Sequence, residues 1–149
     1  MSDFSPQQAK QLSKLLGRPP ICSPTGTAES LLLRYVFLES LVRRVGQYFR
    51  ERNTAQKKSN TEDSSLNVEV VKRSLRYFDI LVDERRVDRL LGSPKARRGQ
   101  RTARELRNGL VHRWDINDAN EAVARFDELT GSMAALIEAI ASRAKRSTP

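Results

Sequence analysis

Apolar residues recur every three or four positions along most of the chain, which is the spacing that places them on one face of an α-helix. Such runs lie within residues 27–52, 68–91, 95–112 and 119–144. Residues 53–65 lack this periodicity and are predicted to form a loop. No segment has the period-two alternation that is typical of a strand. The pattern therefore predicts an all-α protein, a four- to five-helix, up-and-down bundle.

Polar residues mark the expected ends of these helices. Residues 1–26 are predicted to form a short N-terminal helix and a loop, ahead of a single helical domain over residues 27–145. Thr27 or Thr25 is expected to cap the long helix that follows. Asp118, with a glutamate three residues later, resembles an acidic capping box and is expected to begin the last helix.

The chain is strongly basic, with 27 Lys and Arg against 18 Asp and Glu and a formal net charge of +9. Twenty of the cations are arginines, whose planar side chains with several donors suit phosphates and stacked bases. The excess favours a polyanionic partner, nucleic acid first, although a solvated basic surface would give the same total. The placement of the arginines has to decide between the two.

Composition excludes several classes of protein. No apolar run approaches the length of a membrane-spanning helix, about 20 residues, and the N-terminus lacks a secretion signal. A single cysteine, Cys22, allows no internal disulfide, and one cysteine and one histidine cannot build a multi-cysteine or His-rich metal site. We therefore expect a cytoplasmic protein without a metal or other cofactor.

The stretch from 95 to 113 holds seven Lys and Arg, one acid and the only histidine. On an ideal helix, at about 100° per residue, five polar residues of this stretch share one face: Arg97, Arg101, Arg104, Asn108 and His112. The apolar stripe falls on the opposite side, at Ala103, Leu106 and Leu110. We expect an RNA-binding surface here, formed by five arginines: Arg97, Arg98, Arg101, Arg104 and Arg113.

His112 lies among cations, which disfavour a second positive charge, so its pKa is expected to fall and its ring to be neutral at about pH 7. A neutral imidazole accepts a proton, and a neighbouring arginine stabilises charge that grows on a phosphate. Together they suffice for attack of a ribose 2′-hydroxyl on its own phosphodiester, which restricts the substrate to RNA. Arg107 lies about 140° from His112 around an ideal helix. Either the helix distorts near Gly109, or two chains of a symmetric dimer complete the site.

The string Arg107-Asn108-Gly109-Leu110-Val111-His112 resembles the Arg-Asn-x-x-x-His motif of the HEPN superfamily, the higher eukaryotes and prokaryotes nucleotide-binding domain. In that family the motif lies late in an all-α bundle, as it does here. The resemblance implies a metal-independent endoribonuclease that is active as a homodimer, with both motifs lining one cleft. It also implies that Arg107 and His112 are the catalytic pair and that Asn108 orients the site or the phosphate.

The same resemblance implies a biological setting. Many relatives are toxins of toxin–antitoxin, anti-phage or other conflict systems, so an antitoxin protein is an expected partner. The family often has a polar or acidic residue on an earlier helix that faces the motif, and Glu39 and Arg43 are the candidates. Some members bind nucleotides or partners without cleaving RNA, so a non-catalytic RNA- or nucleotide-binding regulatory module is the alternative. A DNA-binding helical domain ranks last, because no helix-turn-helix spacing is evident.

Three other features carry expectations of their own. Trp114 directly follows His112 and Arg113 and could stack on a base, but a core anchor at a helix turn is favoured. The basic residues between 72 and 89 interleave with acidic ones, so surface ion pairing is favoured there over a second phosphate-binding surface. Tyr35 and the other aromatic residues of the long helix are expected to pack in the core.

Overall fold

The computed structural model describes residues 3–20, 26–53, 66–92 and 100–147. Within these ranges the regular secondary structure is helical throughout, which confirms the all-α prediction. Seven helices are described, where the sequence predicted four main helices and a short one, because two of the predicted runs are divided. They are α1 (Pro6–Leu16), α2 (Ala28–Arg52), α3 (Val68–Tyr77), α4 (Glu84–Leu91), α5 (Ala103–His112), α6 (Ile116–Ala124) and α7 (Phe126–Arg146).

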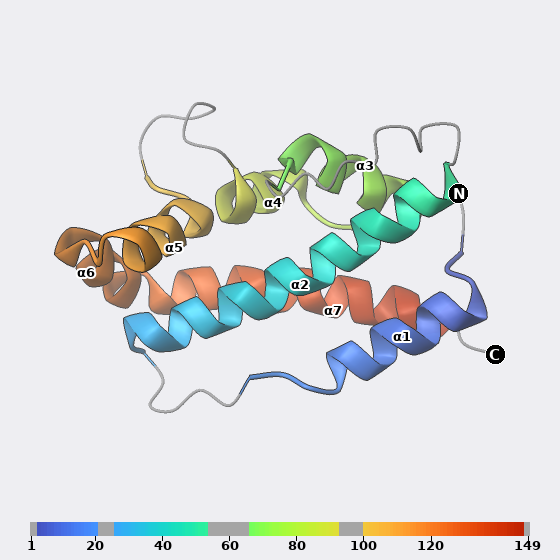
Figure 1. Ribbon diagram of the computed structural model, residues 1–149, viewed down its shortest axis with the longest axis horizontal. Helices are drawn as coiled ribbons and strands as arrows, with labels where there is room; N and C mark the ends of the chain where they lie inside the picture. Colours follow the sequence, from blue (N-terminus) through green and yellow to red (C-terminus); the bar gives the residue numbers. More distant parts are fainter. Residues whose placement is uncertain (1–2, 21–25, 54–65, 93–99, 148–149) are drawn as a thin grey trace.

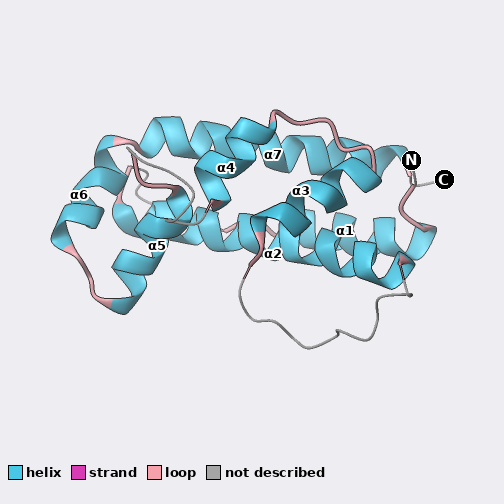
Figure 2. Cartoon of the chain, turned by 90° about the horizontal axis from the view of Figure 1, so that it is seen from above, coloured by secondary structure: helices cyan, strands magenta, loops and turns pink. Residues whose placement is uncertain are grey.

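Successive helical segments run back and forth along the long axis of the molecule (Figure 1). α1 runs one way and α2 returns; α3, α4 and α5 together make the third pass, and α7 makes the fourth. α2 packs against α1, α3, α5, α6 and α7, so it lies at the centre of the bundle. α5 and α6 occupy one end, and the start of α1 and the end of α7 lie at the other (Figures 1 and 2).

The predicted apolar faces form the core of this bundle. On α2 the buried stripe consists of Leu31, Tyr35, Leu38, Val42 and Val45. On α7 it consists of Phe126, Leu129, Met133, Leu136, Ile140 and Ala144. Thr27 begins α2, because its side-chain oxygen accepts the amide N–H of Ser30 (3.1 Å). α2 therefore forms where its periodicity and cap place it, and the apolar face of α7 is buried as predicted.

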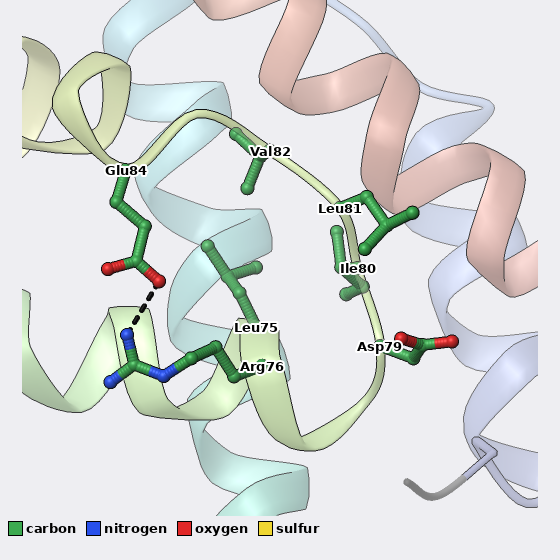
Figure 3. Close-up of a pocket in the computed structure, with 7 residues that line it drawn as sticks. All are labelled: Leu75, Arg76, Asp79, Ile80, Leu81, Val82 and Glu84. Carbon is green, nitrogen blue, oxygen red and sulfur yellow. Dashed lines mark hydrogen bonds and ion pairs between the residues drawn. The ribbon is translucent and has the colours of Figure 1, made fainter.

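The predicted helical run over residues 68–91 is divided into α3 and α4 by a turn. Asp79 has a φ of 59°, a left-handed conformation that commonly ends helices. The amide N–H of Ile80 then donates to the carbonyl oxygen of Leu75 (2.9 Å), and both side chains are buried. Figure 3 shows this turn, the shallow hollow that it lines and the ion pair that spans it.

The last predicted helix is divided as well, and it starts earlier than predicted. α6 begins at Ile116 because the side chain of Asp115 accepts the amide N–H groups of Asn117 (2.9 Å) and Asp118 (3.3 Å). The prediction that Asp118 caps this helix is wrong, since its carboxyl group is buried under α5 instead. The backbone leaves helical geometry at Arg125, with a φ of −105° and a ψ of 18°, which separates α6 from α7.

A buried arginine ties the two ends of the described chain together. Arg143 on α7 donates from Nε to the carbonyl oxygen of Phe78 (2.6 Å) and pairs with the carboxylate of Asp3. Arg143 is 5% exposed, so its charge is stabilised by these bonds rather than by water. These bonds fix Asp3, which lies three residues before α1, and the end of α3 against α7.

Candidate active site

Helix α5 begins later than the sequence predicted. Thr102 is its N-cap, and the Thr102 side chain and Glu105 exchange hydrogen bonds with each other's backbone amides in a capping box (2.7 and 3.1 Å). The Thr102 hydroxyl also donates to the carbonyl oxygen of Gly92 (3.0 Å), which fixes this cap to the end of α4. The prediction of a helix from residue 95 is therefore wrong for residues 100–102, because a capped helix cannot extend past its cap.

Because α5 starts later than predicted, fewer of the residues expected to contact RNA share one helix face. Arg104, Asn108 and His112 lie on α5 at intervals of four residues, as predicted. Arg101 precedes the helix and Arg113 follows it. Arg97 and Arg98 lie outside the described residues.

Arg101 is bonded to a buried carboxylate of α6. Its guanidinium lies 2.8 Å and 3.3 Å from the two carboxylate oxygens of Asp118, a bidentate arrangement. Burial raises the pKa of the Asp118 carboxyl, and the charge of Arg101 opposes that rise. Arg125 adds a second tie, because its Nη1 donates to the carbonyl oxygen of Arg101 (2.8 Å) while its guanidinium pairs with Glu121 and Glu128. Arg101 therefore holds the backbone just before α5 against α6.

The carboxyl group of Asp118 lies directly against Gly109, inside the motif. A Cβ atom at position 109 would lie 1.7 Å from Oδ2 of Asp118 and 2.8 Å from its Cγ, far inside van der Waals contact. The carbonyl oxygen of Gly109 also accepts the amide N–H groups of Arg113 and Asp115, each at 3.2 Å. Glycine is therefore required at this position by the close approach of α6, and α6 fixes the turn that follows His112.

The motif residues themselves are accessible to different degrees. Arg107 is half-buried, and its Nη1 donates to the side-chain oxygen of Asn108 (3.0 Å). The Nε–H of Arg107 is buried and has no hydrogen-bond partner within the part of the chain that the structure describes. A buried donor of this kind requires an explanation, such as an anion that completes its bonding. His112 ends α5 and is exposed to solvent.

Arg107 and His112 do not converge within one chain. α5 is a continuous α-helix from Ala103 to His112, so the distortion near Gly109 that the sequence left open is not observed. On such a helix the two side chains project about 140° apart. Among the described residues, no hydrogen bond or ion pair joins them.

The two earlier-helix candidates, Glu39 and Arg43, lie one helix turn apart on α2. Glu39 and Arg43 form an ion pair at 2.8 Å. Burial raises the pKa of the Tyr35 phenol, the charge of Glu39 raises it further, and the charges of Arg104, Arg107 and Arg43 lower it. The phenol therefore lies within the electrostatic reach of both helices. Core packing of Tyr35 is confirmed, but the influence of Glu39 and of the motif arginine on its phenol could not be read from the sequence.

The turn between α5 and α6 is lined by exposed apolar side chains. Trp114 is 55% exposed, so the prediction that it anchors the core is wrong. The early start of α6 directs the chain away from the core at this point, and Trp114 itself has a φ of 49°. Val111 and Ile116 on either side are also exposed, as is Val123 at the end of α6.

The charged residues of α3 and α4 pair with one another. Lys72 lies 2.9 Å from Asp88, and Arg76 lies 2.6 Å from Glu84. This confirms the prediction of surface ion pairing in that region. At the end of α5, the Arg113 side chain is 62% exposed and lies 4.0 Å from the carboxylate of Asp115.

Comparisons with protein-family models, with curated proteins and with solved structures found no match. None of the helices in the described ranges is long and apolar enough to cross a membrane. Within the same ranges, no group of three or more His, Cys, Asp and Glu side chains is placed to hold a metal ion.

Proposed function

We propose that this chain is a metal-independent endoribonuclease of the HEPN type that acts as a homodimer. The observation that supports the proposal most is the buried Nε–H of Arg107, which has no acceptor among the described residues. Arg107 lies about one and a half helix turns before the exposed His112. Both belong to the string that resembles the HEPN motif, on a late helix of an all-α bundle. The Glu39–Arg43 ion pair on α2 is the candidate for the polar residues that the family often has facing the motif.

The proposed chemistry uses only side chains of this protein. His112 accepts the proton of a ribose 2′-hydroxyl, and the 2′-oxygen attacks the adjacent phosphorus. The bond from phosphorus to the 5′-oxygen breaks, and that oxygen takes up a proton from an imidazolium. The products are a 2′,3′-cyclic phosphate and a 5′-hydroxyl. Arg107 stabilises the negative charge on the non-bridging oxygens, and Asn108 holds the Arg107 side chain in place (3.0 Å).

A homodimer would resolve the divergence of Arg107 and His112, because one cleft would then contain both motifs. Exposed apolar side chains support a second copy of the chain. They come from α5 itself and from α2 and α6, both of which pack against α5: Leu33, Val36, Val111, Ile116 and Val123. Burying such side chains in a dimer would remove them from water. By the same resemblance we propose a cytoplasmic toxin or defence ribonuclease with an antitoxin protein as a partner.

A non-catalytic RNA- or nucleotide-binding module is the second candidate. It is favoured by the engagement of Asn108 with Arg107 and by the absence of any bond between Arg107 and His112 in the described part of a single chain. Under this candidate, RNA binding falls with added salt and survives His112→Ala. Arg113→Glu would weaken it, whereas Lys145→Glu on the distant, exposed end of α7 would not.

The experiment that tests the proposal is cleavage of tRNA and total RNA in the presence of a chelator. Wild type, Arg107→Ala and His112→Ala are compared, with circular dichroism to show that all three are folded. The proposal expects cleavage by wild type and none by either variant. Full activity of folded His112→Ala would refute it, and binding without cleavage by wild type would favour the non-catalytic module.

A further inference from the structure

Trp114 is the single tryptophan of the chain, and more than half of its surface is exposed. Large aromatic side chains are usually buried, and an exposed one commonly marks a binding surface. It lies two residues after His112, on the turn that joins α5 to α6. The side chain therefore borders the candidate active site without belonging to the motif.

The backbone around Trp114 is fixed by hydrogen bonds on both sides. The amide N–H groups of Arg113 and Asp115 both donate to the carbonyl oxygen of Gly109. Asp115 in turn caps α6. Trp114 has a φ of 49°, a left-handed conformation that is unfavourable for a residue other than glycine. The surrounding bonds hold the chain in this conformation, so the ring is carried on a rigid turn.

The residues directly before and after Trp114 are charged, whereas Val111 and Ile116 further along the chain are exposed and apolar. The Arg113 side chain is 62% exposed and lies 4.0 Å from the carboxylate of Asp115, and His112 is exposed as well. Charged residues are depleted at the centres of protein–protein interfaces. An aromatic ring beside an arginine is instead the combination that binds single-stranded nucleic acid, with the ring under a base and the cation near the backbone.

We propose that Trp114 stacks on an unpaired base of the RNA, next to the ribose whose 2′-hydroxyl His112 deprotonates, so that the site selects single-stranded RNA. The inference rests on the proposed function in taking RNA as the ligand. A base within a duplex is already stacked on both faces, and the ring of Trp114 could bind it only after the duplex opened. The geometry thus favours loops and unpaired strands as substrates.

The fluorescence of the single tryptophan gives a direct test. The probe is a 2′-O-methyl oligoadenylate strand, which lacks the nucleophilic hydroxyl and is not cut. It should quench the emission of the wild-type protein saturably, whereas the same strand annealed to its complement, or an abasic strand of equal length, should not. Quenching equal for all three strands, or absent while a labelled strand binds, would overturn the inference.

A variant series adds the energetic test. Stacking on one base is worth about 1–3 kcal/mol, so Trp114→Ala should weaken binding of the labelled strand by about 5- to 150-fold. Trp114→Phe should restore most of the loss. Leu81→Ala removes an apolar side chain that is 81% exposed on the distant α3–α4 turn, and it should change nothing. Binding by Trp114→Ala equal to wild type would overturn the inference.

The same measurements distinguish base stacking by Trp114 from contact with a second copy, and stacking from cleavage. If Trp114 contacts a second copy of the chain instead, its emission will shift to the blue with protein concentration in the absence of RNA, and the inference is wrong. Cleavage by wild type that Trp114→Ala retains in full would overturn the inference and leave the proposed function standing. Base-dependent quenching without any cleavage would uphold the stacking and refute the ribonuclease.

Discussion

Replacing Gly109 by alanine tests whether α6 really packs on the motif through Asp118. The added Cβ would lie 1.7 Å from Oδ2, 2.8 Å from Cγ and 3.3 Å from Cβ of Asp118. The carboxyl group cannot rotate in place, because its oxygens are held by Arg101 and its surface is only 1% exposed. Either the carboxyl group leaves its buried position or α6 moves away from α5.

Both routes cost stability. Overpacking a tight contact costs about 1–3 kcal/mol, and removing one partner from a buried ion pair costs about 3–5 kcal/mol when the other is left buried. Arg101 is 39% exposed and regains water, which lowers that cost, and Ala improves a helix interior over Gly by about 1 kcal/mol. We expect Gly109→Ala to lower the free energy of unfolding by about 2–4 kcal/mol.

The measurement is urea unfolding at neutral pH, run as a double-mutant cycle with Asp118→Ala. That variant lacks the Oδ2 and Cγ atoms that make the two shortest contacts, and a small shift of α6 relieves the 3.3 Å contact with Cβ of residue 118. Gly109→Ala should then be close to neutral, so the two sites should be coupled by about 2–4 kcal/mol. Gly131→Ala is the control, because nothing lies within 4 Å of its added Cβ on α7. It should stabilise by about 0.5–1 kcal/mol.

Additive effects of Gly109→Ala and Asp118→Ala on the free energy of unfolding would contradict this prediction. If Gly109→Ala costs the same with and without the Asp118 carboxyl group, the contact between them does not determine the effect. Stabilisation of the wild-type background by Gly109→Ala would contradict the close approach altogether.

Two further predictions concern stability. Arg143→Met should lower the free energy of unfolding in urea by about 2–4 kcal/mol, because it leaves the carbonyl oxygen of Phe78 without its buried donor; a loss below about 0.5 kcal/mol, the scale of an ordinary surface change, would contradict this. The raised pKa of Asp118 means that the folded state binds its proton more tightly than the unfolded state. Stability from this group should therefore fall as pH rises from about 4, the ordinary pKa of aspartate, through the raised folded value. Asp118→Asn should remove that fall, so the difference in unfolding free energy between wild type and variant should change across this window, and a constant difference would count against it.

The helices that the sequence predicted best are those with the longest periodic runs. The stripes of α2 and α7 are buried as expected, because a face of five or six apolar residues determines which side of a helix meets the core. The divisions at Asp79 and Arg125 were not predicted. Both coincide with tertiary contacts: the burial of Ile80 at one and the hydrogen bond from Arg125 to the carbonyl oxygen of Arg101 at the other.

The candidate site was predictable only in part. The motif string and the shared face of Arg104, Asn108 and His112 follow from residue spacing alone. The bond between Arg101 and Asp118 joins residues seventeen apart, and an aspartate three residues after another aspartate gives no sign of which one caps the helix. That choice decides the start of α6, and with it the exposure of Trp114.

The central claim is that His112 drives cleavage of RNA without a metal ion, and the ends of the RNA fragments test it most directly. A labelled RNA is incubated with wild type or with folded His112→Ala in the presence of a chelator. The account predicts fragments that end in a 2′,3′-cyclic phosphate with wild type and none with the variant. Intact RNA with wild type, or the same fragments from His112→Ala, would contradict it.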